Sequence, residues 1–322
     1  MKAYRIFNLD CMQWLKERES DSVHAVCTDP PYGLVEFSPT ELAKLRAGNG
    51  GIWRLPPNIN GCKRDPLPRF TVLTDADKVG IEEFFVKWGE AMGRVLVPGG
   101  HVLVAGNSYL QHYVQRAMWR AGFEVRGAIV RVYQGFRGGD RPKNAEKEFP
   151  DVCVTAKGYY EPWMIFRKPI SERTVAGNLR RWKTGGMRML TEGHPFPELV
   201  MSGRTPKRED DIATHPCLKP QHFMRIVVRA LLPLGEGMVL DPFMGAGSTI
   251  AAATCVGYES IGIEIDREYF AMAEKAIPRL SRLYPEFHGE TLAQPITNGR
   301  ATYDIPQQMA LALAEESARY GR

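Results

Sequence analysis

The sequence predicts an α/β fold in which helices cover both faces of a doubly wound, mostly parallel β-sheet. The clearest indication lies near the end of the chain, where an apolar strand at 238–240 runs into a glycine-rich turn at 241–249. A helix of small residues follows at 250–254, then a strand at 259–265 that ends in acidic residues, and a further helix is expected from Arg267. Strand, glycine-rich turn, helix and strand in this order make the βαβ unit of such a sheet.

The rest of the chain continues the alternation of strands and helices. Residues 22–28 form a short apolar run that ends abruptly at Asp29, and residues 101–106 form a buried strand after the turn Pro98-Gly99-Gly100. Residues 109–121 carry Tyr and Ala side chains at helical spacing, so a helix is expected there. Further elements are expected as strands at 123–132 and 163–167 and as a helix at 306–321.

Two segments interrupt this alternation. Residues 33–80 are rich in Gly, Pro and Asn, and residues 171–214 hold eight Lys or Arg among Gly and Pro. Loops of this length inside a compact domain are usually functional or disordered. The length of 322 residues, without internal repeats or low-complexity tracts, predicts one domain over 1–322 with two inserted, loop-rich segments.

Composition excludes several classes of protein. The chain is 44% hydrophobic and 25% charged, which excludes a wholly disordered protein, and no apolar run approaches the roughly 20 residues of a membrane span. The six cysteines are scattered without a C-x-x-C pair and the histidines lack metal-ligand spacing, so neither a metal site nor a disulfide framework is expected. Without an export signal at its start, the chain is expected to be cytoplasmic and reduced. A net charge of +5 leans mildly toward polyanionic partners.

The first candidate site is Asp29-Pro30-Pro31-Tyr32, at the end of an apolar strand. Two prolines remove two backbone donors and stiffen the turn, which leaves a carbonyl free to face a ligand beside a carboxylate and a ring. Such a group can accept hydrogen bonds from an exocyclic amine and stack its ring on a flat base. The structural alternative is a proline-rich turn that caps the strand, with Tyr32 packed inward.

The second candidate site is the segment from Asp241 to Thr249, with Glu264 at the end of the next strand. Its glycines let the backbone approach a ligand closely, and an acid at that strand end suits ribose hydroxyls. This pattern alone is equally compatible with NAD or FAD. A dinucleotide fingerprint needs a third glycine where this chain has Ile250, so a ligand without phosphates, such as S-adenosylmethionine, fits better.

The combination of D-P-P-Y upstream of D-P-F-x-G-x-G resembles the β-class of DNA amino-methyltransferases. In that class the catalytic motif precedes the cofactor motif, a circularly permuted order on a Rossmann-like methyltransferase sheet. Leu9-Asp10-Cys11 resembles the family's G-D-C opening, with Leu9 in place of the usual Gly, and His215–Pro220 is similar to its H-P-x-x-K-P segment. Ile263–Asp266 resembles its ribose-binding strand end. Residues 161–169 and 174–178 resemble phage and prophage site-specific DNA-methyltransferases.

The resemblance covers about 1–32, 95–180 and 214–275, and it implies S-adenosyl-L-methionine as the cofactor. Asp29 and the carbonyl of Pro30 accept hydrogen bonds from the target amino group in this family, and Tyr32 stacks on the flipped base. Glu264 is implied to hold the ribose hydroxyls, Asp10 the adenine amine and Lys219 the cofactor carboxylate; the alternative for Lys219 is a surface lysine at a helix start. The full set of implied cofactor-binding residues is Asp10, Cys11, Lys219, Asp241, Phe243, Gly245, Gly247, Ser248, Thr249 and Glu264.

The basic residues of 171–214 occupy the place where the resembled family keeps target recognition. Basic side chains around an aromatic ring suit phosphate contact and base approach, so this segment is expected to bind DNA, the alternative being a solvated loop. The expected DNA-binding residues are Arg180, Arg181, Trp182, Lys183 and Arg188. The implied partner is double-stranded DNA. Dimers are common in the class, and no cognate restriction enzyme is specified.

The predicted function is therefore methyl transfer from S-adenosyl-L-methionine to adenine N6 in a specific duplex sequence by base flipping. Aspartate at the first motif position favours adenine, and N4-cytosine methylation is the close alternative because both chemistries methylate an exocyclic amine. Motif order and Asp29 argue against RNA or a glutamine side chain as acceptor. A nicotinamide-dependent oxidoreductase leaves D-P-P-Y unexplained. A DNA-binding module with an inactive site is a further alternative, although no motif of the chain is broken.

Overall fold

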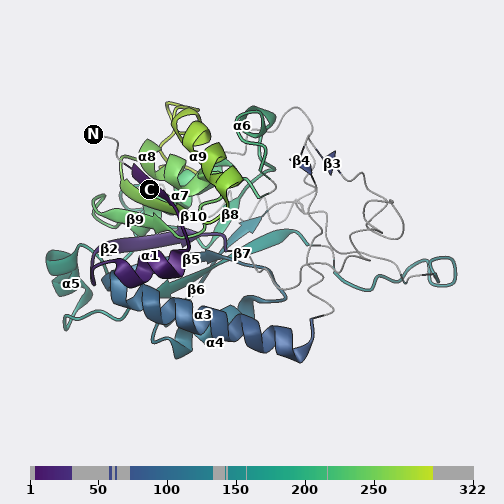
Figure 1. Ribbon diagram of the computed structural model, residues 1–322, viewed down its shortest axis with the longest axis horizontal. Coiled ribbons are helices and arrows are strands. Elements are labelled where there is room, and N and C mark those ends of the chain that lie inside the picture. Colours follow the sequence, from purple (N-terminus) through teal and green to yellow (C-terminus); the bar gives the residue numbers. More distant parts are fainter. Residues whose placement is uncertain are drawn as a thin grey trace.

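The predicted apolar runs pair into one mixed sheet with the strand order β1-β10-β9-β2-β5-β7-β6-β8 (Figure 1). The computed structural model describes residues 4–30, 58–59, 62–63, 73–132, 142, 144–156, 158–215 and 217–292. In this part of the chain the sheet contains β1 (Tyr4–Asn8), β2 (Val23–Thr28), β5 (Leu96–Ala105), β6 (Glu124–Val132), β7 (Tyr160–Arg167), β8 (Leu199–Met201), β9 (Met238–Asp241) and β10 (Glu259–Glu264). The strands β3 (Asn58–Ile59) and β4 (Cys62–Lys63) form a separate antiparallel pair.

The first strand of the chain lies beside the last one. β1 pairs in parallel with β10, β10 with β9, β9 with β2, and β2 with β5. β7 is inserted antiparallel between β5 and β6, so the sheet is mixed rather than wholly parallel. The α/β, Rossmann-like class predicted from the sequence is confirmed, and β2, which Asp29 follows, lies beside β9, which ends at Asp241.

Helices cover both faces of this sheet (Figure 1). The helices α1, α3 and α4 pack on one face, where Trp88 and Met118 belong to the same buried cluster as Val26 of β2. The helices α7 and α8 pack on the other face, where Phe223 belongs to the same buried cluster as Ala25 and Cys27, the neighbours of Val26 along β2. This alternation is what a strand buried on both faces requires. The helices are α1 (Cys11–Glu17), α3 (Asp75–Val95), α4 (Gln111–Arg120), α5 (Val175–Trp182), α6 (Lys207–Asp210), α7 (Gln221–Leu231), α8 (Ser248–Cys255) and α9 (Arg267–Leu280).

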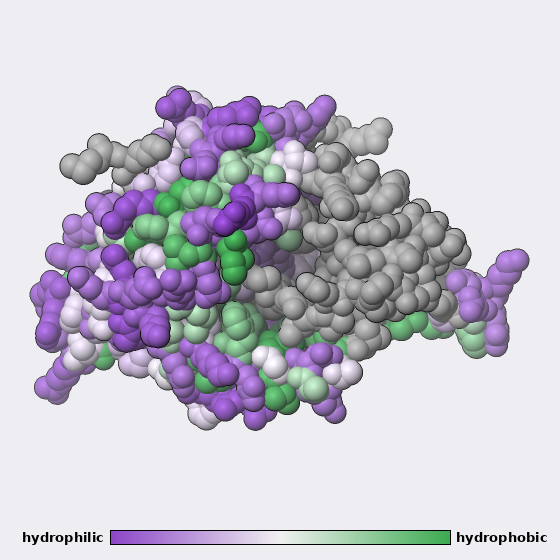
Figure 2. All heavy atoms as spheres, in the orientation of Figure 1, coloured by the Kyte–Doolittle hydropathy of each residue, from purple (hydrophilic) through white to green (hydrophobic). Residues whose placement is uncertain are grey.

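Polar residues cover most of the coloured surface on the face drawn in Figure 2, with smaller apolar patches between them. This distribution fits helices whose apolar sides are turned toward the sheet. Within the described residues, no helix is long and apolar enough to cross a membrane. The same residues hold no group of three or more His, Cys, Asp or Glu side chains placed to bind a metal ion.

Two predicted boundaries are wrong. The turn Pro98-Gly99-Gly100 lies inside β5, where Val23 pairs with Leu96 but Ala25 pairs with His101, so the turn forms a large bulge within the strand. Gly99 makes this bulge with φ +79°, a conformation that side chains rarely adopt. The end of the 33–80 segment is helical, because Thr74 and Asp77 form a capping box that starts α3. The expected helix at 306–321 lies outside the described residues.

The 171–214 segment was expected to be one loop-rich unit. In the structure, its two parts lie at opposite ends of the parallel strands. Its first part forms α5, which is fixed at the start of β5 because buried Asn178 donates to the carbonyl of Pro98 at 2.9 Å. Its second part forms β8, which pairs in parallel with β6, and the single turn α6. These two parts lie at opposite ends of the strands. The segment therefore reaches both ends of the strands.

Candidate active site

The crevice predicted by the fold lies between the neighbouring strands β9 and β2. From β9 the chain passes through α8 to β10 on one side, and from β2 it passes through α3 to β5 on the other side, with α8 and α3 on opposite faces. In open α/β sheets, ligands bind outside the carboxyl ends of the strands at such a switch point. Asp241 ends β9 and Asp29 follows β2, so both acids of the predicted motifs reach this edge.

Asp241 connects the two strands at the bottom of the crevice. Its Oδ1 accepts hydrogen bonds from Thr28 Oγ1 at 2.7 Å and from the backbone N of Phe243 at 3.1 Å. The side chain is 3% exposed, and burial raises its pKa to about 6, against the hydrogen bonds from Thr249, Thr28 and Phe243 that lower it. Asp241 therefore stabilises the turn that follows β9 through these hydrogen bonds. Its predicted contact with a cofactor stays a prediction.

The raised pKa of Asp241 predicts a pH-dependent effect of Asp241→Asn on stability. The folded carboxyl keeps its proton up to a pH of about 6, whereas the unfolded carboxyl loses it near 3.8. Stability is therefore lost as the pH rises through this window, by up to roughly 3 kcal/mol for a shift of about two units. Asparagine keeps an acceptor oxygen for Thr28 and Phe243 without the charge.

We expect the variant to gain stability relative to wild type between pH 4 and pH 6.5, and denaturant unfolding at several pH values measures this gain. A stability difference that is constant across the range would contradict the assignment.

The glycine-rich turn closes over the end of β10. Gly245 has φ +50° and donates its backbone N–H to Glu264 Oε2 at 2.9 Å, and the backbone N of Asp266 donates to Glu264 Oε1 at 2.9 Å. A carboxylate has about four lone-pair sites, so each oxygen retains one for a ligand hydroxyl. A side chain at Gly245 would meet the ring of His215, with Nε2 at 3.0 Å from the added Cβ.

The neighbouring residues of this crevice fit a nucleoside that carries no phosphates. The ring of Phe243 lies 6.1 Å from the Trp88 ring and 6.4 Å from the half-exposed Phe84 ring, which makes an aromatic wall. Acidic side chains, Glu264 among them, line the same edge, and they disfavour a pyrophosphate but suit hydroxyls, amines and a cationic sulfonium. The donor set therefore fits S-adenosyl-L-methionine better than a dinucleotide.

Asp10 lies at the same edge, because β1 ends beside Glu264 in the register Asn8↔Glu264. Its Oδ1 caps α1 by accepting from the backbone N of Met12 at 2.8 Å and Gln13 at 3.1 Å. Cys11 is buried in the core under α1, and burial, with the nearby Asp10 charge, raises the pKa of its thiol to about 12. Its thiol is therefore uncharged at neutral pH, and the predicted ligand contacts of Asp10 and Cys11 stay predictions.

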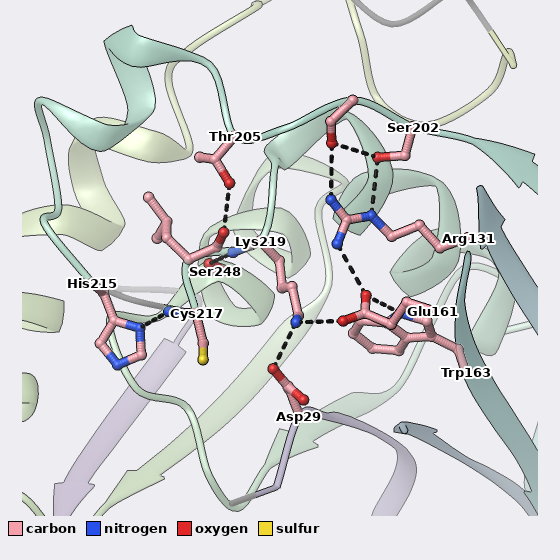
Figure 3. A network of polar contacts seen from close by, with 12 residues as sticks. Asp29, Arg131, Glu161, Trp163, Ser202, Thr205, His215, Cys217, Lys219 and Ser248 are labelled. Atoms are coloured by element: carbon pink, nitrogen blue, oxygen red, sulfur yellow. Dashed lines mark hydrogen bonds and ion pairs between the residues drawn. The ribbon is translucent and has the colours of Figure 1, made fainter. Parts of the chain in front are cut away.

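Asp29 is held by an ion pair with Lys219, at 2.7 Å between Oδ2 and Nζ (Figure 3). Lys219 precedes α7, and its backbone N donates to Ser248 Oγ at the start of α8. The Lys219 side chain is only 12% exposed, so the surface-lysine alternative is wrong. Burial raises the pKa of the Asp29 carboxyl, and the Lys219 charge opposes that shift. The predicted contact of Lys219 with a cofactor carboxylate stays a prediction.

Three residues that the sequence did not single out for a role complete the network. Lys219 Nζ also contacts Glu161 Oε1 at 2.8 Å, and Glu161 Oε2 accepts from Arg131 at 3.0 Å and from Trp163 Nε1 at 2.9 Å (Figure 3). Charged residues within otherwise apolar strands, Arg131 in β6 and Glu161 at the start of β7, are the signal that could have found them.

The predicted DNA-binding group lies at the amino ends of the parallel strands, at the end of the sheet opposite to Asp29. Lys183 contacts Glu236 at 3.6 Å, just before β9 begins, and Arg188 donates to the hydroxyl of Tyr258 at 3.1 Å. β2 has six residues, so its two ends are about 20 Å apart. The structure therefore separates this group from Asp29. Two of its members also have local partners: Arg181 pairs with Glu172 at 2.8 Å, and Trp182 Nε1 donates to Ser171.

Contact of this group with DNA stays a prediction, and such a contact would lie at a distance from the target base. Within the group, Arg180, Arg181 and Lys183 are exposed.

Among the catalytic-motif residues, Pro30 is buried beside Asp29, whereas Pro31 and Tyr32 lie outside the described residues. Of the remaining cofactor-motif residues, Ser248 and Thr249 are buried at the start of α8, and Gly247 has φ +86° against Ile277 of α9.

Comparison with known proteins identifies the class that this fold and site define. A family model described as DNA methylase matches residues 23–275, which is most of the chain. The chain therefore belongs to the DNA methylase family, whose members transfer a methyl group from S-adenosyl-L-methionine. The match spans both Asp29 and the glycine-rich turn.

Individual relatives are distant but cover most of the chain. The type II methyltransferase M.HindIII of Haemophilus influenzae is 24% identical over 83% of this chain and 93% of its own length. The DNA adenine methyltransferase YhdJ of Escherichia coli is 25% identical over 84% of this chain and 81% of its own length. Among solved structures, the PvuII cytosine-N4-specific DNA methyltransferase shares the fold, with a TM-score of 0.54, 15% identity and coverage of 90% and 92%.

Proposed function

We propose that this chain methylates the N6 amino group of adenine in a specific sequence of double-stranded DNA. The observation that carries this proposal is the Asp29 carboxylate, ion-paired with Lys219 at the carboxyl edge of β2, next to the crevice at the end of β9. Aspartate at this position is typical of adenine methylation in the resembled β-class, to which we assign the chain. The adenine methyltransferase YhdJ among its relatives supports the same acceptor.

Asp29 and the carbonyl of Pro30 act on the acceptor. Both accept hydrogen bonds from the exocyclic amino group, which turns its nitrogen toward the methyl donor and raises its electron density. The acceptor nitrogen would carry a positive charge once it has gained the methyl group. Asp29 stabilises that charge and takes up the proton that the nitrogen then loses. Stacking of the flipped base on Tyr32 offsets part of the few kcal/mol that base flipping costs.

The crevice beyond the carboxyl end of β9 holds the cofactor in this proposal. S-adenosyl-L-methionine supplies an activated methyl group on a sulfonium. Glu264 accepts from the ribose hydroxyls through the lone pairs that its two backbone contacts leave open. Asp10, at the end of the neighbouring β1, accepts from the adenine amine. The Phe243 ring, which lies next to Trp88 and Phe84, would pack against the adenine of the cofactor.

Gly245→Asp is expected to abolish cofactor binding. The new side chain meets the His215 ring at the Cβ position and brings a second carboxylate beside Glu264. The change should weaken the affinity for S-adenosyl-L-methionine by about 100-fold or more, measured by calorimetry, given about 1.4 kcal/mol for each factor of ten. Gly186→Asp is the matched control, because a side chain there meets nothing within 4 Å. An unchanged affinity of the Gly245 variant would remove this glycine from the cofactor crevice.

The acceptor base and its sequence context are tested in cells. Expression of the wild-type chain in a host without adenine methylation, followed by base-resolved sequencing of its DNA, should reveal N6-methyladenine in one short sequence. Methylated cytosine at the N4 position would contradict the adenine assignment, and methylation without sequence preference would contradict the assignment of a specific site.

The homodimer that is common in the resembled class stays a prediction, and light scattering of the purified chain tests it.

A further inference from the structure

The start of β7 carries an acid, Glu161, which lies beside the catalytic edge and to which the sequence assigns no role. β7 runs antiparallel to β5, so its first residues lie at the carboxyl end of β5 and β2. Trp163 pairs with Ala105, the last residue of β5, and Glu161 comes two residues earlier on the same face of β7. Glu161 therefore projects past the end of β5 toward Asp29, and Lys219 lies between them (Figure 3).

Four charges form a balanced and largely buried row along this edge. Asp29, Lys219, Glu161 and Arg131 alternate in sign, and their side chains are 25%, 12%, 14% and 5% exposed. Desolvation offsets much of the attraction within ion pairs that are shielded from water, but removing one member is costly because it leaves the charge of its partner buried and uncompensated. The position of Lys219 therefore depends on both of its carboxylate partners.

Glu161 is the more firmly fixed of these two partners. It lies directly opposite Arg131 in the β6–β7 register, and it accepts from the Trp163 indole of its own strand. Arg131 in turn donates to Ser202 Oγ at 3.0 Å and to the carbonyl of Gly203 at 3.0 Å, next to β8. A lysine ammonium lies on a flexible four-carbon stem, so it needs such a fixed partner to occupy one place.

We propose that Glu161 is a positioning residue for the methyl transfer: it holds the Lys219 ammonium against Asp29, and thereby fixes the charge and orientation of the carboxylate that receives the acceptor amine. This inference rests on the proposed function of Asp29. Glu161 itself touches neither the acceptor nor the cofactor in this arrangement. Burial works against its charge, but Lys219 and Arg131 outweigh burial and lower the pKa of Glu161 to about 2, so it is anionic at any working pH.

The test compares Glu161→Gln with Glu124→Gln. Both changes neutralise a glutamate that pairs with an arginine across β6 and β7, but Glu124 pairs with Arg167 at the opposite ends of these strands. Wild type and both variants are assayed with labelled S-adenosyl-L-methionine on unmethylated duplex DNA. The kcat, the cofactor dissociation constant and the melting temperature are measured for each.

Glu161→Gln should lower kcat by about 10- to 100-fold, the scale of a small misplacement of reacting groups, with cofactor affinity kept within about threefold. Glu124→Gln should leave kcat within about twofold of wild type. Glu161→Asp, which keeps the charge one methylene further from Lys219, should give an intermediate kcat and serves as a second variant if the glutamine protein does not fold.

Three outcomes would overturn this role: a kcat of Glu161→Gln within about threefold of wild type, a loss equal to that of Glu124→Gln, or a parallel loss of cofactor affinity. Wild type tests the proposed function separately. If it methylates cytosine, the adenine assignment fails while the Glu161 comparison is still valid. If it methylates no DNA, both proposals fail.

Discussion

Asp29→Asn is expected to lower kcat by about 100- to 1,000-fold, the scale seen when one charge-stabilising group is removed from a transition state. The amide has the size of the carboxylate but carries no charge, so it neither offsets the positive charge that develops on the acceptor nitrogen nor takes up its proton. Lys219 retains Glu161 as a partner at 2.8 Å in this variant, so the fold of the site is expected to persist. Single-turnover methylation of duplex DNA measures the loss.

Cofactor binding is the control for the Asp29 variant. Asp29 lies at the end of β2, whereas Glu264 ends β10 and Gly245 lies in the turn between β9 and α8, so the dissociation constant for S-adenosyl-L-methionine should stay within about threefold of wild type. Asp29→Ala should behave alike, with a loss at least as large. A variant that loses cofactor affinity with its activity would place Asp29 in the cofactor crevice instead, and a fully active variant would exclude it from the reaction.

Lys219→Met is expected to have the second-largest effect, and the loss should depend on pH. Burial raises the pKa of Asp29 and Lys219 opposes that shift, so the carboxyl is expected to hold its proton to a higher pH without this lysine. A protonated Asp29 cannot accept from the amine in the same way. We therefore expect kcat to fall by about 100-fold near pH 7 and to recover partly as the pH rises and Asp29 ionises.

Lys168→Met is the matched control for Lys219. Lys168 contacts Asp21 at 2.7 Å and is also partly buried, but this pair lies at the amino edge of the sheet. Its removal should leave kcat and the pH profile unchanged. If Lys219→Met instead keeps kcat and loses cofactor affinity, the lysine binds the cofactor carboxylate, as the family resemblance implies, and does not hold Asp29.

The sequence predicted the elements that follow from periodicity. Apolar runs over 22–28 and 259–265 became β2 and β10 almost to the residue, and the glycine-rich turn before Ser248 became the connection from β9 to α8. These elements are determined locally, because burial on both faces demands a continuous apolar run and the turn demands residues such as Gly247, with φ +86°. The fold class and the carboxyl-edge position of Asp29 followed from them.

The contacts that the sequence could not predict depend on the register of distant strands. Glu161 reaches Lys219 only because β7 is inserted antiparallel beside β5, which brings its first residues to the catalytic edge. The basic group around Trp182 was expected near the target base, yet Asn178 fixes α5 at the opposite edge through its contact with Pro98. No pattern of charge or hydrophobicity within these segments contains that information, since tertiary pairing decides it.

The most direct test of the account is the chemical identity of the methylated product. Purified wild-type chain is incubated with labelled S-adenosyl-L-methionine and unmethylated duplex DNA, and the DNA is digested and separated into nucleosides, with the Asp29→Asn protein treated in parallel. We expect label in N6-methyladenine for wild type and almost none for the variant. Equal label in both proteins, or label from wild type in a nucleoside other than N6-methyladenine, would contradict the proposed role of Asp29 in adenine methylation.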